Sequence, residues 1–131
     1  LKDFGFSVPV YSNIEEIQAS IERNATVADS TIDTRLRIIK NNTVGNTDKS
    51  AAGFWATTDT TILYGGTNDK WGESWSPADI NSSGFGLVLA ANVNVASTAR
   101  VDGVLLKVFY TIPVSNNSIF NAMVIFGDFN G

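Results

Sequence analysis

The chain has 131 residues, which is enough for one ordinary domain with its own core and too few for a second. Hydrophobic residues make up 44% of it and charged residues 17%, as is typical of a folded protein, and no run of about 18 apolar residues predicts a membrane-spanning helix. A net charge of −4 argues against nucleic acid or an anionic membrane as partner, and the lack of Cys and His excludes thiolate chemistry, histidine relays, disulfides and the usual zinc sites.

Strands and turns are predicted along most of the chain, because short runs of Val, Ile, Phe and Tyr are separated by Asn, Thr, Ser and Gly. The chain begins with Leu1 and shows no leader-like segment, so we expect either that a leader was removed or that this is a processed or excised piece of a longer chain. The expected strands cover residues 4–9, 31–40, 84–91, 101–111 and 119–126.

Three of these strands have informative side-chain patterns. In residues 31–40, alternation places Ile32, Thr34, Leu36 and Ile38 on one face and Asp33, Arg35 and Arg37 on the other. In residues 101–111 it places Val104, Leu106, Val108 and Tyr110 opposite Leu105, Lys107 and Phe109. Residues 84–91 are continuously apolar, which is typical of a central strand buried on both faces.

Residues 12–22 fit two kinds of element. Residues 12–15 match a helix capping box, and isoleucines recur after them near helical spacing. Ile17, Ala19 and Ile21 also alternate with polar residues, as in a half-buried strand. We favour the strand, because the surrounding segments are all predicted to be strands.

The predicted fold class is all-β, an antiparallel β-sandwich of the jelly-roll or Ig-like kind with at most one short helical turn. That turn is expected at residues 76–80, with Ser76 as N-cap and Pro77 at the first helical position. Residues 1–131 form one predicted domain, in which residues 112–131 are a linker followed by an extra C-terminal strand.

The pattern of titratable residues does not predict an enzyme. Acidic residues are scattered and mostly flank turns, so no pair of facing carboxylates of the glycosidase type is expected. The serine-nucleophile elbow, the phosphate-binding loop and the calcium-binding loop motifs are absent from the sequence. No catalytic residue, metal site or cofactor is predicted, apart from a structural calcium that loop groups such as Asp29, Asp48 or Asp69 could bind.

The aromatic group formed by Trp55, Tyr64, Trp71 and Trp75 is the most specific local feature of the sequence. As a functional site, Trp55, Trp71 and Trp75 would be a platform on which sugar rings stack. As structural residues, they would close the loop onto the sandwich and cap its core. We favour the structural interpretation, because Trp71 and Trp75 are next to turn-forming Gly and Pro.

Several segments resemble a β-sandwich domain found in tailed-phage virion proteins and in some bacterial surface or secreted proteins. The most specific is residues 55–89, with the sequence WATTDTTILYGGTNDKWGESWSPADINSSGFGLVL. GFSVP at residues 5–9, IER at 21–23, VDGV at 101–104 and YT at 110–111 match the same pattern in order. The resemblance implies a structural or adhesive role in a virion or at a cell surface, and no catalysis.

The chain departs from that pattern at both ends. Family members usually have further strands before the GFSVP segment and stop near the YT pair, whereas this chain continues to Gly131. The extra strand could fold back into its own sandwich, or it could cross to a neighbouring subunit and polymerise the protein. The candidate self-assembly residues of that strand are Ile119, Phe120, Met123, Val124, Ile125 and Phe126.

We therefore expect a non-enzymatic structural protein of a virion (a capsid decoration, tail or fibre component) or of a surface filament. Its expected partners are further copies of itself or other structural proteins, and its expected mechanism is burial of apolar strand faces between subunits. The alternative is a carbohydrate-binding or adhesion module that uses exposed Trp residues to bind a surface glycan.

Overall fold

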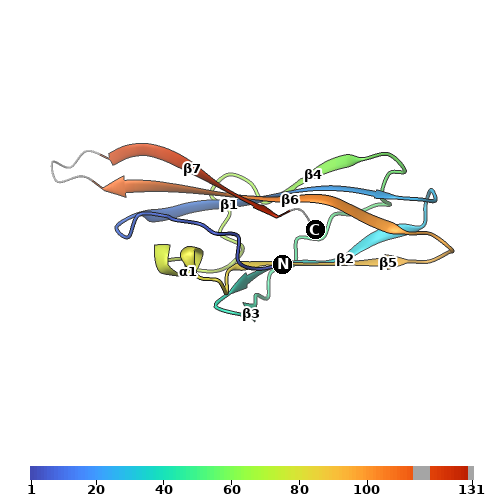
Figure 1. The fold of residues 1–131 in the computed structure, drawn as a ribbon, viewed down its shortest axis with the longest axis horizontal. Coiled ribbons are helices and arrows are strands. Elements are labelled where there is room, and N and C mark those ends of the chain that lie inside the picture. Colours follow the sequence, from blue (N-terminus) through green and yellow to red (C-terminus); the bar gives the residue numbers. More distant parts are fainter. Residues whose placement is uncertain (114–118, 130–131) are drawn as a thin grey trace.

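Two antiparallel sheets packed face to face form the molecule, which confirms the predicted all-β sandwich (Figure 1). The computed structural model describes residues 1–113 and 119–129, and for the last strand it describes the backbone. The strands are β1 (Asn13–Ala25), β2 (Thr31–Lys40), β3 (Thr43–Val44), β4 (Thr60–Tyr64), β5 (Gly86–Val93), β6 (Ala99–Pro113) and β7 (Ile119–Phe129). One sheet has the order β4-β1-β6-β7 and the other β3-β2-β5. Within the described residues, no helix is long and apolar enough to span a membrane.

Strand β1 resolves the ambiguity of residues 12–22 in favour of the strand. Ile17, Ala19 and Ile21 all point inward and are fully buried. Each pairs with a residue of β6 across the ladder, so Ala19 faces Leu106 and Ile21 faces Val104. In β6 the predicted alternation is confirmed, since Val104, Leu106, Val108 and Tyr110 are buried and the residues between them are not. Strands β1 and β6, with 13 and 15 residues, are therefore the two long central strands of the larger sheet.

Strand β2 departs from the predicted alternation at one point. A β-bulge lies between Asp33 and Arg35, where the register against β5 shifts. After the bulge, Leu36 and Ile38 face the core as predicted. Before it the faces are exchanged, so Asp33 is buried and Ile32 is only half-buried. The prediction that Asp33 points away from the core is wrong, because the inserted residue reverses the direction of every side chain before it.

The N-terminal segment is not the opening strand that residues 4–9 predict. Instead, residues 1–2 meet β5: Leu1 accepts a hydrogen bond from the backbone N–H of Leu87 (N···O 2.8 Å), and Lys2 forms a bridge with Gly86. The side chains of Phe4, Phe6 and Val8 are buried in the core. This segment therefore acts as an apolar plug rather than as a strand.

Two strands differ from their predicted places in the sheets. Residues 84–91 were expected to be a central strand, but β5 is the last strand of the smaller sheet, and its residues after Leu87 are half-buried or exposed. Residues 112 and 113 were expected to begin a linker, but they belong to β6 and pair with Phe120 and Ile119 of β7. Central position and strand length depend on pairing partners that are distant in sequence, and local hydrophobicity does not encode these partners.

The single helix of the described residues, α1 (Pro77–Asn81), has the predicted cap. Ser76 is the N-cap, Pro77 occupies the first turn, and Ile80 is buried. Burial by itself raises the pKa of Asp79. The hydrogen bonds that this carboxylate accepts from the N–H and hydroxyl of Ser76, together with Asn41 and the charge of Lys40, outweigh burial and lower the pKa.

Gly86 is predicted to be essential for the contact between the N-terminus and β5. A Cβ atom at this position would lie 2.0 Å from the backbone oxygen of Leu1 and 2.8 Å from Cα of Lys2. Gly86→Ala should therefore displace residues 1–2 and lower the free energy of unfolding by about 1–3 kcal/mol in urea titrations. Gly66→Ala is the matched control, since a Cβ there meets nothing within 4 Å. Equal stabilities of the two variants would contradict this contact.

Candidate functional site

A buried ion pair joins the two sheets. Arg23 of β1 and Asp33 of β2 form a salt bridge through Nη1 and Oδ1, and both side chains are almost fully excluded from solvent. The Arg23 guanidinium carbon lies 4.6 Å from the centre of the Trp55 ring and 5.8 Å from that of Tyr64. The cation is therefore enclosed by one carboxylate and two aromatic rings.

Asp33 uses both carboxylate oxygens in this cluster. Oδ1 also accepts from the indole N–H of Trp55 (2.9 Å), and Oδ2 accepts from the Tyr64 hydroxyl (2.9 Å) and the Ala51 backbone N–H (2.8 Å). Burial raises the pKa of Tyr64, and the hydrogen bond to Asp33 and the charge of that carboxylate raise it further, so the phenol remains a donor. A carboxylate with this many internal donors has a structural role, and the cluster offers no open position for a substrate.

The structure divides the three tryptophans that the sequence singles out. Trp55 is 3% exposed and donates to Asp33, while Trp71 is 0% exposed and donates to the backbone oxygen of Ile17 (2.9 Å). Neither ring is available at the surface for stacking. Trp75 is half-buried: its indole N–H donates to the Lys70 carbonyl (2.9 Å), and its ring packs edge-on against Phe85. A sugar platform made of all three rings is therefore wrong, and Trp75 is the member that a ligand could reach.

Trp75 lies in the wall of an open groove with a volume of about 560 Å³. One side of the groove is formed by the start of β1 and the residue before it, and the other by the loop that leads to α1. The lining residues are Ser12, Asn13, Ile14, Glu15, Lys70, Glu73, Ser74 and Trp75. A volume of this size is within the range of small-molecule sites, about 300–1,000 Å³.

The two carboxylates of the groove are held by different elements. Glu15 accepts a hydrogen bond from the Thr111 hydroxyl of β6 (3.0 Å). Glu73 lies beside Gly45: a Cβ atom added to that glycine would be 3.3 Å from Glu73 Oε1. Retaining and inverting glycosidases need two carboxylates that face each other across the scissile bond. Glu15 and Glu73 lie on opposite sides of the groove, and Glu15 is bonded to Thr111, so no facing pair of free carboxylates is shown there.

One buried hydroxyl in the groove wall has no partner. Ser12 is 6% exposed, and among the described residues its Oγ is the one buried side-chain polar atom without a hydrogen bond. A buried polar group left unsatisfied costs about 1–3 kcal/mol. The sequence suggests a helix cap at this position, but in the sandwich Ser12 precedes a strand and has no helix N-terminus to cap.

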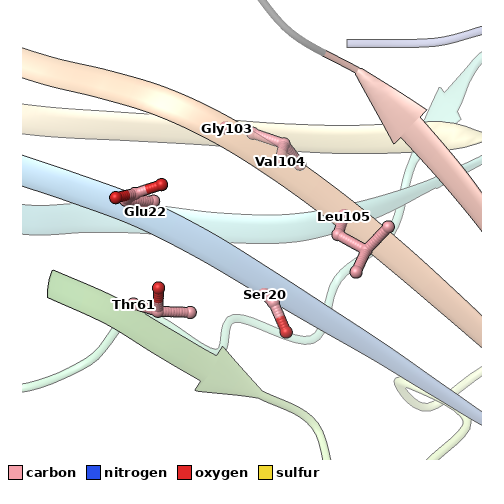
Figure 2. Close-up of a pocket in the computed structure, with 6 residues that line it drawn as sticks. All are labelled: Ser20, Glu22, Thr61, Gly103, Val104 and Leu105. Atoms are coloured by element: carbon pink, nitrogen blue, oxygen red, sulfur yellow. The ribbon is translucent and has the colours of Figure 1, made fainter.

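A second hollow, of about 240 Å³, lies on the outer face of the larger sheet (Figure 2). In this view Ser20 and Glu22 of β1 lie between Thr61 of β4 on one side and Leu105 and Gly103 of β6 on the other. The register pairs Glu22 with Gly103, whose missing side chain leaves the space. The hollow has one carboxylate and two hydroxyls, which is too little for metal binding or for paired acid–base chemistry.

The aspartates considered for calcium do not converge. Asp48 accepts from the N–H groups of Leu36 and Ser50, and Asp69 pairs with Lys49 (2.6 Å). Asp29 is exposed in a turn with φ of 51°. Across the residues that the structure describes, no group of three or more acidic side chains could hold a metal ion.

The C-terminal strand pairs within its own chain. Strand β7 lies antiparallel to β6, with Ile125 opposite Val108 and Val124 opposite Phe109 (Figure 1). The side chains of the six candidate self-assembly residues lie outside the described part of the chain, and nothing follows for them individually. Within the single chain, β7 thus takes the first of the two arrangements that the sequence left open, in which the strand folds back into its own sandwich.

Comparisons with known proteins identify no relative: no family model, no curated protein and no solved structure matches this chain.

Asp33 is predicted to be the most sensitive polar position. Asp33→Asn removes the charge that balances Arg23 in the interior, so it should lower the free energy of unfolding by about 3–5 kcal/mol. Tyr64→Phe, which removes one donor, should cost about 1–2 kcal/mol. Urea unfolding followed by fluorescence measures both, and the exposed Asp29→Asn is the control, expected within about 0.5 kcal/mol of wild type. A wild-type midpoint for Asp33→Asn would refute the role of the cluster.

Asp48 is predicted to contribute stability that depends on pH. Backbone N–H groups of Ser50 and Leu36 donate to its carboxylate and lower its pKa from 3.8 to about 2. A carboxylate whose pKa is lowered by folding stabilises the protein at pH values above the pKa of the unfolded state. This stabilisation is lost as the pH falls from about 4 to about 2. Asp48→Asn should cost about 1 kcal/mol at pH 7, allowing for screening at this partly exposed site, and nothing below pH 2. Urea titrations at several pH values test this, and a difference that does not vary with pH would contradict it.

Proposed function

We propose that the protein is a non-enzymatic structural protein of a virion, as a capsid decoration, tail or fibre component, or of a surface filament. In this role it assembles with copies of itself or with other structural proteins by packing sandwich faces and pairing strand edges. The observation that carries the proposal is the contrast between a polar interior that is internally bonded and the edge strand β4, which pairs with β1 alone among the described strands. The resemblance noted in the sequence is what supports a virion or a cell surface as its location.

Internal bonding favours a rigid building block. Arg23, Asp33 and Tyr64 satisfy one another in the interior, and Glu16 accepts from Gln18 and from the Asn68 backbone N–H. Buried charges with complete sets of partners fix how two sheets are aligned, whereas catalytic groups are usually left partly unsatisfied and accessible to substrate. A shape fixed in this way suits a subunit that must repeat the same contacts many times.

Strand β4 favours edge pairing as one mode of contact. It ends the larger sheet, and Thr61 and Leu63 point away from the core. Leu63 is 56% exposed, which is unusual for a large apolar side chain on a terminal strand. Proteins that avoid edge-to-edge association usually place a charge at such a position. The apolar edge of β4 is therefore a surface to which another strand could add.

A second candidate function, glycan binding in an adhesion module, is favoured by one observation. Trp75 is partly exposed in a polar groove that also contains the unpaired Ser12 hydroxyl. An adhesive protein and an assembled structural protein are compatible roles, because the groove and the β4 edge are formed by different residues.

Self-association should depend on Leu63. Sedimentation velocity over a range of concentrations should give an average mass that rises above the 14.1 kDa of one chain. Leu63→Lys should weaken association by about tenfold or more, because a lysine on the edge must be desolvated when a strand adds. Val95→Lys is the matched control, a change of similar exposure (54%) outside the strands, and should leave association unchanged. A mass of one chain up to about 1 mM protein would contradict self-assembly.

A further inference from the structure

We propose that the groove beside Trp75 binds a neutral sugar residue of a glycan. The inference rests on the second candidate function, glycan binding, and assigns it to a specific place. It does not depend on self-assembly. The ligand class follows from the Trp75 ring, the charges that line the groove and the Ser12 hydroxyl.

The aromatic wall provides a surface for the C–H face of a sugar ring. The face of an indole ring carries negative charge density, and the C–H groups on one side of a pyranose ring carry a partial positive charge. Trp75 is held in place by its hydrogen bond to the Lys70 carbonyl and by Phe85, whose ring centre is 5.4 Å away. A ring fixed by both contacts loses little conformational freedom when a ligand stacks on it.

The charges around the groove disfavour an acidic ligand. Glu15 and Glu73 line the groove together with Lys70, which leaves one carboxylate in excess. Lys40 Nζ lies 5.5 Å from the centre of the Trp75 ring, but its charge is paired with Asp79 (3.6 Å). An acidic sugar is therefore repelled, and a neutral one is not. Side chains of both hydrogen-bonding types are present, which suits hydroxyl groups because each hydroxyl donates once and accepts twice.

The Ser12 hydroxyl lacks a hydrogen-bond partner among the described residues, and Ser12 lines the groove. Its Oγ is covered as the side chain stands. A rotation about χ1 that brings the Oγ to the groove would let a ligand hydroxyl give it the partner that it lacks. A group kept unsatisfied at a cost in stability is a common feature of binding sites.

A glycan array tests the function, and nuclear magnetic resonance tests the place. The labelled full chain is first applied to the array. A neutral monosaccharide present in the bound glycans, such as galactose, glucose or N-acetylglucosamine, is then titrated into ¹⁵N-labelled protein. The indole N–H signal of Trp75 and the amides of residues 12–15 should shift, while the indole signals of Trp55 and Trp71 should not, since both rings are buried elsewhere.

Two variants sharpen the test. Trp75→Leu keeps an apolar contact with Phe85 but removes the ring, and it should weaken binding by about tenfold or more. Ser12→Ala should weaken binding several-fold while leaving the unfolding midpoint equal to wild type or higher, because it removes an unsatisfied buried group. Ser20→Ala, a serine-to-alanine change in the other hollow, should alter neither binding nor the indole signal of Trp75.

The outcomes separate the site from the function. Array binding together with shifts at Trp75 and loss in both variants supports the proposal. Array binding that is unchanged in Trp75→Leu and Ser12→Ala keeps glycan binding but overturns this groove as its site. Binding only of acidic glycans, with no neutral ligand, overturns the ligand class. No binding on the array overturns both the function and the site, and leaves the sedimentation result to decide self-assembly on its own.

Discussion

The Arg23–Asp33 pair is the constraint on which the alignment of the two sheets depends. The cation comes from β1 of the larger sheet and the carboxylate from β2 of the smaller one, so a shift of either sheet by one residue would separate two buried charges. Trp55 and Ala51, in the connection from β3 to β4, donate to the same carboxylate and tie that long segment to the core. Apolar packing alone tolerates small displacements between layers, whereas a bonded ion pair does not.

The sequence predicted those elements whose signals are local. The α1 cap needs only Ser76, Pro77 and Asp79, which are close in the chain, and the alternation of β6 can be recognised within one strand. The bulge after Asp33 could not be predicted in this way, because the alternation of polar and apolar residues continues through it in the sequence and only the partner strand reveals the shift in register. The edge position of β5 and the plug made by Phe4 and Phe6 depend on segments far along the chain.

The tryptophans show why the candidate site was only partly predictable. All three occur within one short stretch of sequence, and nothing in that stretch distinguishes a core ring from a surface ring. The distinction comes from the partner that each indole N–H finds: Asp33 across the sandwich for Trp55, the β1 backbone for Trp71, and the nearby Lys70 carbonyl for Trp75. A ring bonded within its own loop stays near the surface with that loop. Ser12 was missed as a groove residue because its lack of a partner is a property of the folded structure.

The polar groups of the interior are bonded to one another, whereas some groups at the surface lower the stability of the isolated chain. Donors enclose the buried charges, so the charges stabilise one alignment of the sheets and have little capacity left to bind other molecules. The groups that are not optimised for stability, Leu63 on the β4 edge and the Ser12 hydroxyl, lie where another molecule could cover or bond them. The proposed edge pairing and the proposed groove site both use positions at which stability is given up, whereas the groups of the charged core are already bonded to one another.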